Sequence, residues 1–406
     1  MTTASPPPAM KVPLLDLRPQ YEKIAAEVQA VIGKVCASQQ FILGPEVREL
    51  EQRMARYTGC EHGIGVSSGT DALLLALMAL GIGAADAVIT SPFTFFATAG
   101  TIARVGARPI FCDIEPDTFN LSPAKVEALI ARDCEVRGQG AERHVIHRPS
   151  GARVKAIMPV HLYGQVCDMD ALMGLARPLG LHVIEDAAQA IGAQDRKGRM
   201  AGAVGDIGCF SYFPTKNLGA FGDAGLCTTR DSALAQRMRV LRVHGMEPKY
   251  HHSLIGGNFR LDEIQAAVLN VKLGYLDGWM AARDAHARQY TERLRGPQAA
   301  GKLVTPVHRE GGRHVWNQYV IRAQRRDELR QYLAAAGIGT EIYYPIPLHQ
   351  QECFAYLDYR AGEMPESERA SGEVLALPVF PELTAAQIDY VAGTIERFYT
   401  GAPAQA

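Results

Sequence analysis

Short apolar runs and longer stretches with a helical repeat alternate along most of this chain. A short run bounded by turn residues is typical of a buried strand, whereas apolar positions three or four residues apart indicate a helix. The short runs predict strands at 87–90, 109–113, 155–160, 182–186, 206–211 and 225–229. Because helical patterns separate most of them, we expect an α/β fold with a mostly parallel sheet.

The last third of the chain follows a different pattern. After Leu261 a helical stretch around 265–269 leads into a longer one at 281–294. Beyond it, apolar patterns predict strands at 316–321 and 339–343 and helices at 326–335 and 385–397. We therefore expect the following division: a flexible start at 1–11, a large domain at 12–260, a bridging helix with a small C-terminal domain at 261–400, and a flexible tail at 401–406.

Composition excludes several other classes of protein. Lys and Arg number 42 against 43 Asp and Glu, so nothing favours nucleic-acid binding. The longest apolar stretch, 72–80, is too short to cross a bilayer, and the first residues lack a signal peptide's apolar core. We therefore expect a cytoplasmic protein without a membrane partner. The eight cysteines form no C-x-x-C pair, which predicts reduced thiols and no metal site.

Lys216 is the first candidate for chemistry. It ends the segment FSYFPTK at 210–216, where apolar residues and a turn follow an expected strand. Burial disfavours the ammonium form of lysine, so its amine becomes a nucleophile that can hold an aldehyde as a Schiff base. A lysine that extends into solvent from a turn would have the same local sequence.

Asp186 is the second candidate, at the end of the run HVIED at 182–186. If Ile184 and Asp186 share a face, Asp186 lies at the carboxyl end of a buried strand, where ligands of open α/β sheets bind. A buried carboxylate is costly unless it meets a cation, and a protonated pyridine nitrogen would supply one. A helix N-cap over Ala187 and Ala188 is the alternative interpretation.

The third candidate is the segment VSSGTDALLLAL at 66–77, in which small hydroxyl residues and Gly69 lead into an apolar helix. Free N–H groups and the positive end of the helix dipole favour a phosphate at such a start. An ordinary N-cap would have much the same sequence.

In this chain order, the three candidates resemble fold-type I enzymes that depend on pyridoxal 5′-phosphate (PLP). More narrowly, the chain resembles the DegT/DnrJ/EryC1/StrS family of nucleotide-sugar aminotransferases, from about residue 12 to about residue 399. The resemblance rests on the motifs FILGPE (41–46), SGTDAL (68–73), SPFTF (91–95), HLYGQ (161–165), EDAAQ (185–189), SYFPTK (211–216) and GNFRLD (257–262). It implies a seven-stranded, mostly parallel sheet in the large domain and a small C-terminal α/β domain.

The resemblance also implies roles for individual residues. Lys216 would form the Schiff base with PLP, and Asp186 would pair with the pyridinium nitrogen. Other cofactor contacts would come from Gly69, Thr70 and Ser211 at the phosphate, Gln189 at the phenolic oxygen, Phe95 over the ring, and Asn258 from the neighbouring subunit of a homodimer. A phenylalanine in the run at 93–96 could instead be a core residue, which is the alternative for Phe95.

The activity implied is a two-stage amino transfer. An amino acid, most often L-glutamate in this family, would leave its amine on the cofactor as the pyridoxamine form (PMP), which would then aminate a keto nucleotide sugar. Lys216 would act as the general base. Family members that dehydrate instead have lost this lysine, whereas Lys216 is present here.

The sugar is predicted from two segments, 249–262 and 343–350, which resemble members that aminate C3 of a nucleotide sugar. Candidate substrate contacts are Arg260, Tyr344 and His349, although His349 is also compatible with a surface loop. A 3-oxo UDP- or dTDP-sugar is therefore expected, and a 4-oxo sugar is the alternative. A non-catalytic, regulatory member of the fold is the alternative from another class.

The segment 134–153 is longer than the usual family connection and has turn signals at both ends. We expect a protruding loop or hairpin there. It would be either a surface elaboration or a part of the substrate mouth or the dimer edge. A dinucleotide-dependent oxidoreductase is disfavoured, because GIGV at 63–66 lacks the third glycine of that fingerprint.

Overall fold

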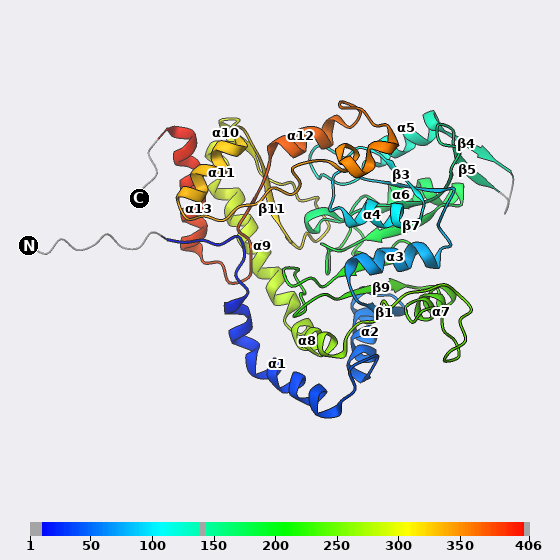
Figure 1. Ribbon diagram of the computed structural model, residues 1–406. Coiled ribbons are helices and arrows are strands. Elements are labelled where there is room, and N and C mark those ends of the chain that lie inside the picture. Colours follow the sequence, from blue (N-terminus) through cyan, green and yellow to red (C-terminus); the bar gives the residue numbers. More distant parts are fainter. Residues whose placement is uncertain (1–9, 139–142, 402–406) are drawn as a thin grey trace, which may run out of the picture.

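The computed structural model describes residues 10–138 and 143–401 (Figure 1). Most of the expected flexible start and tail lies outside these ranges. Seven strands form the continuous path of the main sheet, in the order β1-β9-β8-β7-β6-β2-β3. They are β1 (His62–Val66), β2 (Asp86–Thr90), β3 (Arg108–Phe111), β6 (Arg153–Met158), β7 (His182–Asp186), β8 (Ile207–Ser211) and β9 (Gly225–Thr229).

The main sheet is mostly parallel, as expected. The pairs β2–β3, β2–β6, β6–β7 and β7–β8 are parallel, whereas β9 runs antiparallel to both β8 and β1. The carboxyl ends of the parallel strands therefore meet at one edge, which is the edge where α/β sheets bind ligands. Asp186 and Ser211 are the last residues of β7 and β8 and so lie together at that edge.

Helices cover both faces of this sheet because alternate strand residues point to opposite sides. Ile184 packs into a core with one group of helices, whereas Val183 packs into a second core on the other face. The first group is α3 (Gly69–Ala79), α4 (Ala97–Arg104) and α7 (Ser232–Leu241). The second is α2 (Pro45–Thr58), α5 (Pro123–Asp133), α6 (Met169–Ala176) and α8 (Glu263–Leu273).

The C-terminal part has its own sheet and core. The long helix α9 (Leu276–Arg293) leads from α8 to this part (Figure 1). Its sheet has the order β10-β11-β12, with β10 (Leu303–Val304), β11 (Tyr319–Ala323) and β12 (Val374–Leu377). The remaining helices are α1 (Arg18–Ser38) near the N-terminus, and α10 (Arg295–Ala299), α11 (Arg326–Ala335), α12 (Pro365–Glu373) and α13 (Ala385–Thr400). Two sheets with separate cores support our proposal that the chain divides into two domains near residue 261.

One predicted element is wrong. Residues 339–343 form no strand, and Glu341 makes only an isolated bridge to Ala376. The third strand of the small sheet is instead β12, whose run VLAL directly follows α12 without a turn residue between them. Apolar runs of this length do not reveal which of two candidates pairs with β11, because tertiary packing decides the pairing.

The sequence predicted a protruding loop or a hairpin in the long segment before β6, and the structure has a hairpin there. Strands β4 (Cys134–Arg137) and β5 (His144–His147) pair with each other, and β5 pairs with the first residues of β6. The hairpin protrudes at the right of Figure 1, far from α13. Among the described residues no helix has the length and apolarity to cross a membrane, and no cluster of His, Cys, Asp and Glu is suited to a metal ion.

Candidate active site

Asp186 lies at the carboxyl end of β7, on the face covered by α3 and α4. It is 4% exposed, and Ile184 on the same face is fully buried. Thr98 in the first turn of α4 donates its hydroxyl hydrogen to Oδ2 at 2.7 Å, and the N–H of Ala188 donates to Oδ1 at 3.2 Å. Burial raises the pKa of Asp186, while Thr98 opposes that rise. The carboxylate is thus held in place, and it forms no ion pair within the described residues, although Lys216 attracts it through space.

Lys216 lies on the loop that follows β8 and faces the same space. Its N–H donates to the carbonyl oxygen of Phe213 at 2.8 Å, which fixes a turn after the strand. The surrounding protein lowers the pKa of Lys216 to about 8, although the attraction of Asp186 opposes this shift. A lysine with this pKa has a substantial neutral fraction near neutral pH and can act as a nucleophile or base.

The start of α3 approaches the end of β8 closely. Ser68 is the N-cap and accepts the N–H of Asp71. The N–H groups of Gly69 and Thr70 have no intrahelical acceptor, because they lie in the first turn. A Cβ atom at Gly69 would lie 2.5 Å from Cβ of Ser211. Only glycine therefore permits this approach, which places two free N–H groups beside the Ser211 hydroxyl. This arrangement suits an anion such as a phosphate.

An aromatic wall borders the site. Phe95 is 59% exposed, so it is not a core residue, and its ring lies 6.3 Å from that of Tyr344. Gln189 donates from Nε2 to the hydroxyl of Tyr344 at 3.1 Å and accepts the N–H of Tyr163 at 2.7 Å. An exposed aromatic face beside an oriented amide is suited to a flat, polar ring.

The remaining candidate residues, which are the cofactor contact Asn258 and the substrate contacts Arg260 and His349, differ in how exposed they are. Asn258 is exposed and its side chain has no hydrogen bond within the described chain, whereas Nε of Arg260 is buried without a partner there. The N–H of Ser67 donates to the carbonyl of Phe259, so this segment runs beside the start of α3. His349 is only 3% exposed, and its Nε2 lies 3.1 Å from Glu368, which removes it from the surface.

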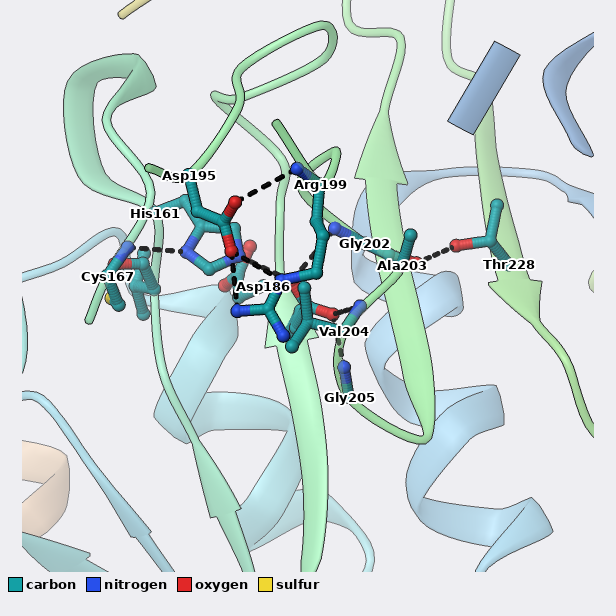
Figure 2. Close-up of polar contacts among 12 residues, drawn as sticks. His161, Cys167, Asp186, Asp195, Arg199, Gly202, Ala203, Val204, Gly205 and Thr228 are labelled. Carbon is teal, nitrogen blue, oxygen red and sulfur yellow. Dashed lines mark hydrogen bonds and ion pairs between the residues drawn. The ribbon is translucent and has the colours of Figure 1, made fainter. Parts of the chain in front are cut away.

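A buried ion pair supports β7 from the opposite face. His161 and Glu185 are fully buried, with Nε2 of His161 2.8 Å from the carboxylate and Nδ1 3.2 Å from the main-chain nitrogen of Cys167. The N–H groups of Gly202, Val204 and Gly205, which Figure 2 labels together with His161, also donate to the Glu185 carboxylate. Burial opposes a charged His161, but its contacts with Cys167 and Glu185 outweigh burial and raise the pKa of His161 to about 10. Burial likewise disfavours ionised Glu185, and its contacts with His161 and the N–H groups lower its pKa nevertheless.

Sequence reasoning brought together Asp186, Lys216, Ser211 and the start of α3, and the structure places these at one edge of the sheet. The sequence did not predict the contact of Thr98 with Asp186 or the ion pair of His161 with Glu185. Thr98 has no local signal, because it reaches Asp186 across 88 residues of chain. His161 and Glu185 both lie in quoted motifs, and strand alternation already separated Glu185 from Asp186.

The residues present fit a pyridine cofactor that carries a phosphate. Three features surround one space: a buried carboxylate that forms no ion pair within the described residues, an amine with a lowered pKa, and a helix start that only glycine permits. The first suits a protonated ring nitrogen, the second an aldehyde, and the third a phosphate.

Comparisons with known proteins agree with this arrangement. A protein of Geobacillus stearothermophilus named pleiotropic regulatory protein is 49% identical over 391 residues, covering 96% of this chain and 99% of that protein. A UDP-N-acetyl-3-dehydro-α-D-glucosamine 3-aminotransferase of Acidithiobacillus ferrooxidans is 43% identical over 390 residues, covering 96% and 98%. The crystal structure of Streptomyces venezuelae DesV with a ketimine intermediate matches with a TM-score of 0.87 and 40% identity, covering 96% and 98%.

Other solved structures that match this chain include one with bound PMP. The chain is therefore a PLP-dependent sugar aminotransferase with the fold of those structures, and its cofactor alternates between PLP and PMP. The family model of the DegT/DnrJ/EryC1/StrS aminotransferases matches residues 22–396, so the chain belongs to that family.

Proposed function

We propose that this enzyme transfers the amino group of L-glutamate to C3 of a 3-oxo UDP- or dTDP-sugar. The observation that carries the transfer chemistry is the pairing of Lys216, with its lowered pKa, and the buried Asp186 across one site. The preference for C3 is supported by the relative that is named a 3-aminotransferase and matches almost end to end.

The cofactor would be held at three points. The N–H groups at Gly69 and Thr70 and the hydroxyl of Ser211 would bind its phosphate, and Asp186 would pair with its ring nitrogen. Phe95 would cover one face of the ring, and Gln189 would orient its phenolic oxygen. When bound, PLP supplies an electron sink for the carbanion formed at the donor's α-carbon.

Lys216 would then carry the proton that the reaction moves. Its amine is already close to half deprotonated near pH 8, so it can take a proton from the donor and return it without a large energetic cost. Asp186 must stay ionised for this cycle, because only the carboxylate favours a protonated ring. Thr98 supports that state through its hydrogen bond.

The sugar nucleotide would bind on the side of Tyr344 and Arg260. A guanidinium whose buried Nε lacks a partner is suited to the diphosphate. His349 would reach the substrate only through Nδ1, which is buried without a hydrogen bond. Asn258 would contact the cofactor phosphate of the partner subunit, so each site would be complete only in a homodimer.

A regulatory role without catalysis is the alternative raised by the name of the 49% identical relative. Loss of the lysine or of its carboxylate would favour that role. Both residues are present, in the environment that the chemistry requires.

The visible spectrum of the purified protein tests the proposal, with Lys216→Ala as the control. Wild type should absorb in the visible range, lose this absorbance with L-glutamate, and regain it with a 3-oxo nucleotide sugar, while Lys216→Ala should do none of these. Recovery with a 4-oxo sugar alone would replace the C3 assignment. A wild-type protein that ignores every amino donor after incubation with PLP would overturn the proposed transfer.

A further inference from the structure

A pocket of about 330 Å³ lies between the start of α1 and the loop after β8. Its apolar walls are formed by Leu17, Tyr21 and Ile24 on one side and by Pro214 and Phe221 on the other. The rings of Tyr21 and Phe221 meet edge to face, with centroids 5.7 Å apart. None of the candidate active-site residues belongs to this lining, so the pocket is a separate place in the fold.

Lys272 of α8 brings an amine into this pocket. Helix α1 lies beside α8 (Figure 1), and Ile24 packs with Val268 in a small core between them. Lys272 is 4% exposed, lines the pocket, and donates from Nζ to the carbonyl oxygen of Gly219 at 2.5 Å. Its Nζ also lies 5.7 Å from the centre of the Phe221 ring. The amine is therefore held at the pocket wall, next to an aromatic side chain.

No acidic side chain of the described residues neutralises Lys272. Burial lowers its pKa to about 8, and no carboxylate opposes that shift. The lining contains no Asp or Glu among the described residues, and its other cation, Arg18, is 84% exposed and paired with Asp16 at 2.7 Å. A buried lysine without an anion loses its proton readily, and in apolar surroundings the neutral amine is a nucleophile.

The walls and the amine together favour an uncharged carbonyl compound as the ligand. A phosphate or carboxylate would lose its hydration against the apolar side chains and would meet only one buried cation. An aldehyde with an apolar body has no charge to desolvate, and the amine can bond to it covalently. A volume of about 330 Å³ admits an aromatic ring with a short substituent.

We propose that Lys272 is a second reactive lysine, which forms a reversible imine with small apolar aldehydes in the pocket beside α1. The nitrogen lone pair bonds to the carbonyl carbon, and the carbonyl oxygen leaves as water with the two protons of the neutral amine. A C=N bond remains, and the step requires no oxidant or reductant. The adduct would fill the space between α1 and the loop that carries Lys216.

Labelling of the PLP-loaded protein with benzaldehyde tests the proposal. Sodium cyanoborohydride donates a hydride to the imine carbon and makes the adduct permanent, and peptide mass spectrometry then locates it. At pH 7 the neutral fraction of Lys272 is on the order of 100-fold larger than that of a lysine with an ordinary pKa. We therefore expect Lys272 to be labelled at least about 10-fold faster than a lysine outside the pocket.

Lys155 is the matched comparison. Its Nζ also donates to a main-chain carbonyl oxygen, that of Gly81 at 2.8 Å, but it forms an ion pair with Asp86 at 2.9 Å. An adduct at Lys272 that forms no faster than the one at Lys155 would overturn the proposal, as would the absence of any adduct at Lys272. Labelling requires no turnover, so neither result depends on the proposed function.

A substitution in the pocket wall tests whether the aldehyde enters there. Leu17 is half-buried, and Leu17→Trp would fill part of the pocket while Lys272 stays in place. Overpacking costs about 1–3 kcal/mol, so labelling of Lys272 should slow by about fivefold or more, whereas labelling of Lys155 should not change. Equal labelling of Lys272 in Leu17→Trp and wild type would exclude this pocket as the binding site.

Thermal unfolding without the reductant gives a second readout. A ligand that binds only the folded state raises Tm, so benzaldehyde should raise the Tm of wild type and of Lys155→Met. Lys272→Met keeps the apolar volume but lacks the amine, and it should lose this increase. The same increase in Lys272→Met would show binding without an imine and would overturn the proposal. If Lys272→Met does not fold, the labelling of wild type and Leu17→Trp decides the question.

Discussion

Two opposing influences act on the carboxylate of Asp186. Burial raises its pKa, and the hydroxyl of Thr98 stabilises the ionised form at 2.7 Å. Thr94 lies 3.1 Å from Thr98 Oγ1 and extends this contact to a second hydroxyl. A hydrogen bond to the charged form of an acid lowers its pKa, so Thr98 sets the lowest pH at which the carboxylate remains ionised.

Thr98→Val should therefore move the acidic limb of the pH profile of kcat/KM to higher pH. Loss of a hydrogen bond to a charged group costs about 1.5–3 kcal/mol, which corresponds to a shift of about one to two pH units. Thr98→Ser should restore the wild-type profile. The control is Thr101→Val, whose hydroxyl bonds only to main-chain carbonyls of α4. An unchanged acidic limb in Thr98→Val would show that Asp186 does not depend on this contact.

At the scale of elements, cofactor binding depends on how closely the start of α3 approaches the end of β8. Gly69→Ala would place a Cβ atom 2.5 Å from Cβ of Ser211, so the helix start must move away from the strand end. Overpacking of this kind costs about 1–3 kcal/mol, and we expect PLP affinity to fall by about tenfold or more. Equilibrium dialysis with PLP measures this. Gly33→Ala in α1, where the new Cβ meets nothing within 4 Å, should bind PLP as wild type does.

The ion pair of His161 with Glu185 joins β7 to the loops on its other face. His161→Gln leaves Glu185 buried without its cation, and breaking a buried pair costs about 3–5 kcal/mol of unfolding free energy. The pKa of His161 is raised from 6.5 to about 10, so its contribution is fully present below pH 6.5 and is lost as the pH rises through about 10.

Urea denaturation at several pH values measures the predicted loss. The stability difference between wild type and His161→Gln should be large near pH 6 and should shrink towards pH 10. His182→Gln is the matched control, because His182 lies 3.7 Å from Asp206 and is 44% exposed. Equal effects of the two substitutions would contradict a structural role for the buried pair.

The elements that the sequence predicted best are those with local signals. Strands β7 and β9 begin and end where their apolar runs do, and α11 matches its helical pattern. Strand β1 was missed because Gly63 and Gly65 interrupt its apolar pattern, although each glycine lies where the backbone or side chains of other segments leave no room for a Cβ. Thr98 could not be predicted as a site residue, since its partner Asp186 comes from a distant part of the chain.

At the scale of the whole molecule, the proposed dimer predicts that two inactive variants can restore activity when their chains are mixed. If Asn258 serves the partner's cofactor, a mixed dimer of Lys216→Ala and Asn258→Ala chains contains one site with both wild-type residues. Each variant alone should be impaired, whereas the mixture should regain activity in proportion to the mixed dimers formed. No gain after mixing and subunit exchange would show that each chain completes its own site.

The β4–β5 hairpin has a consequence for how this fold can change. It bonds to the first residues of β6, whereas Asp186 ends the neighbouring parallel strand, so hairpin and chemistry occupy opposite ends of the sheet. Insertions between β4 and β5 should therefore leave catalytic activity unchanged and should not be removed by selection on that activity. A reporter domain inserted there should give a fusion protein that keeps its enzymatic activity. In evolution, an insertion at the same position could add a binding site for a new partner without changing the substrate.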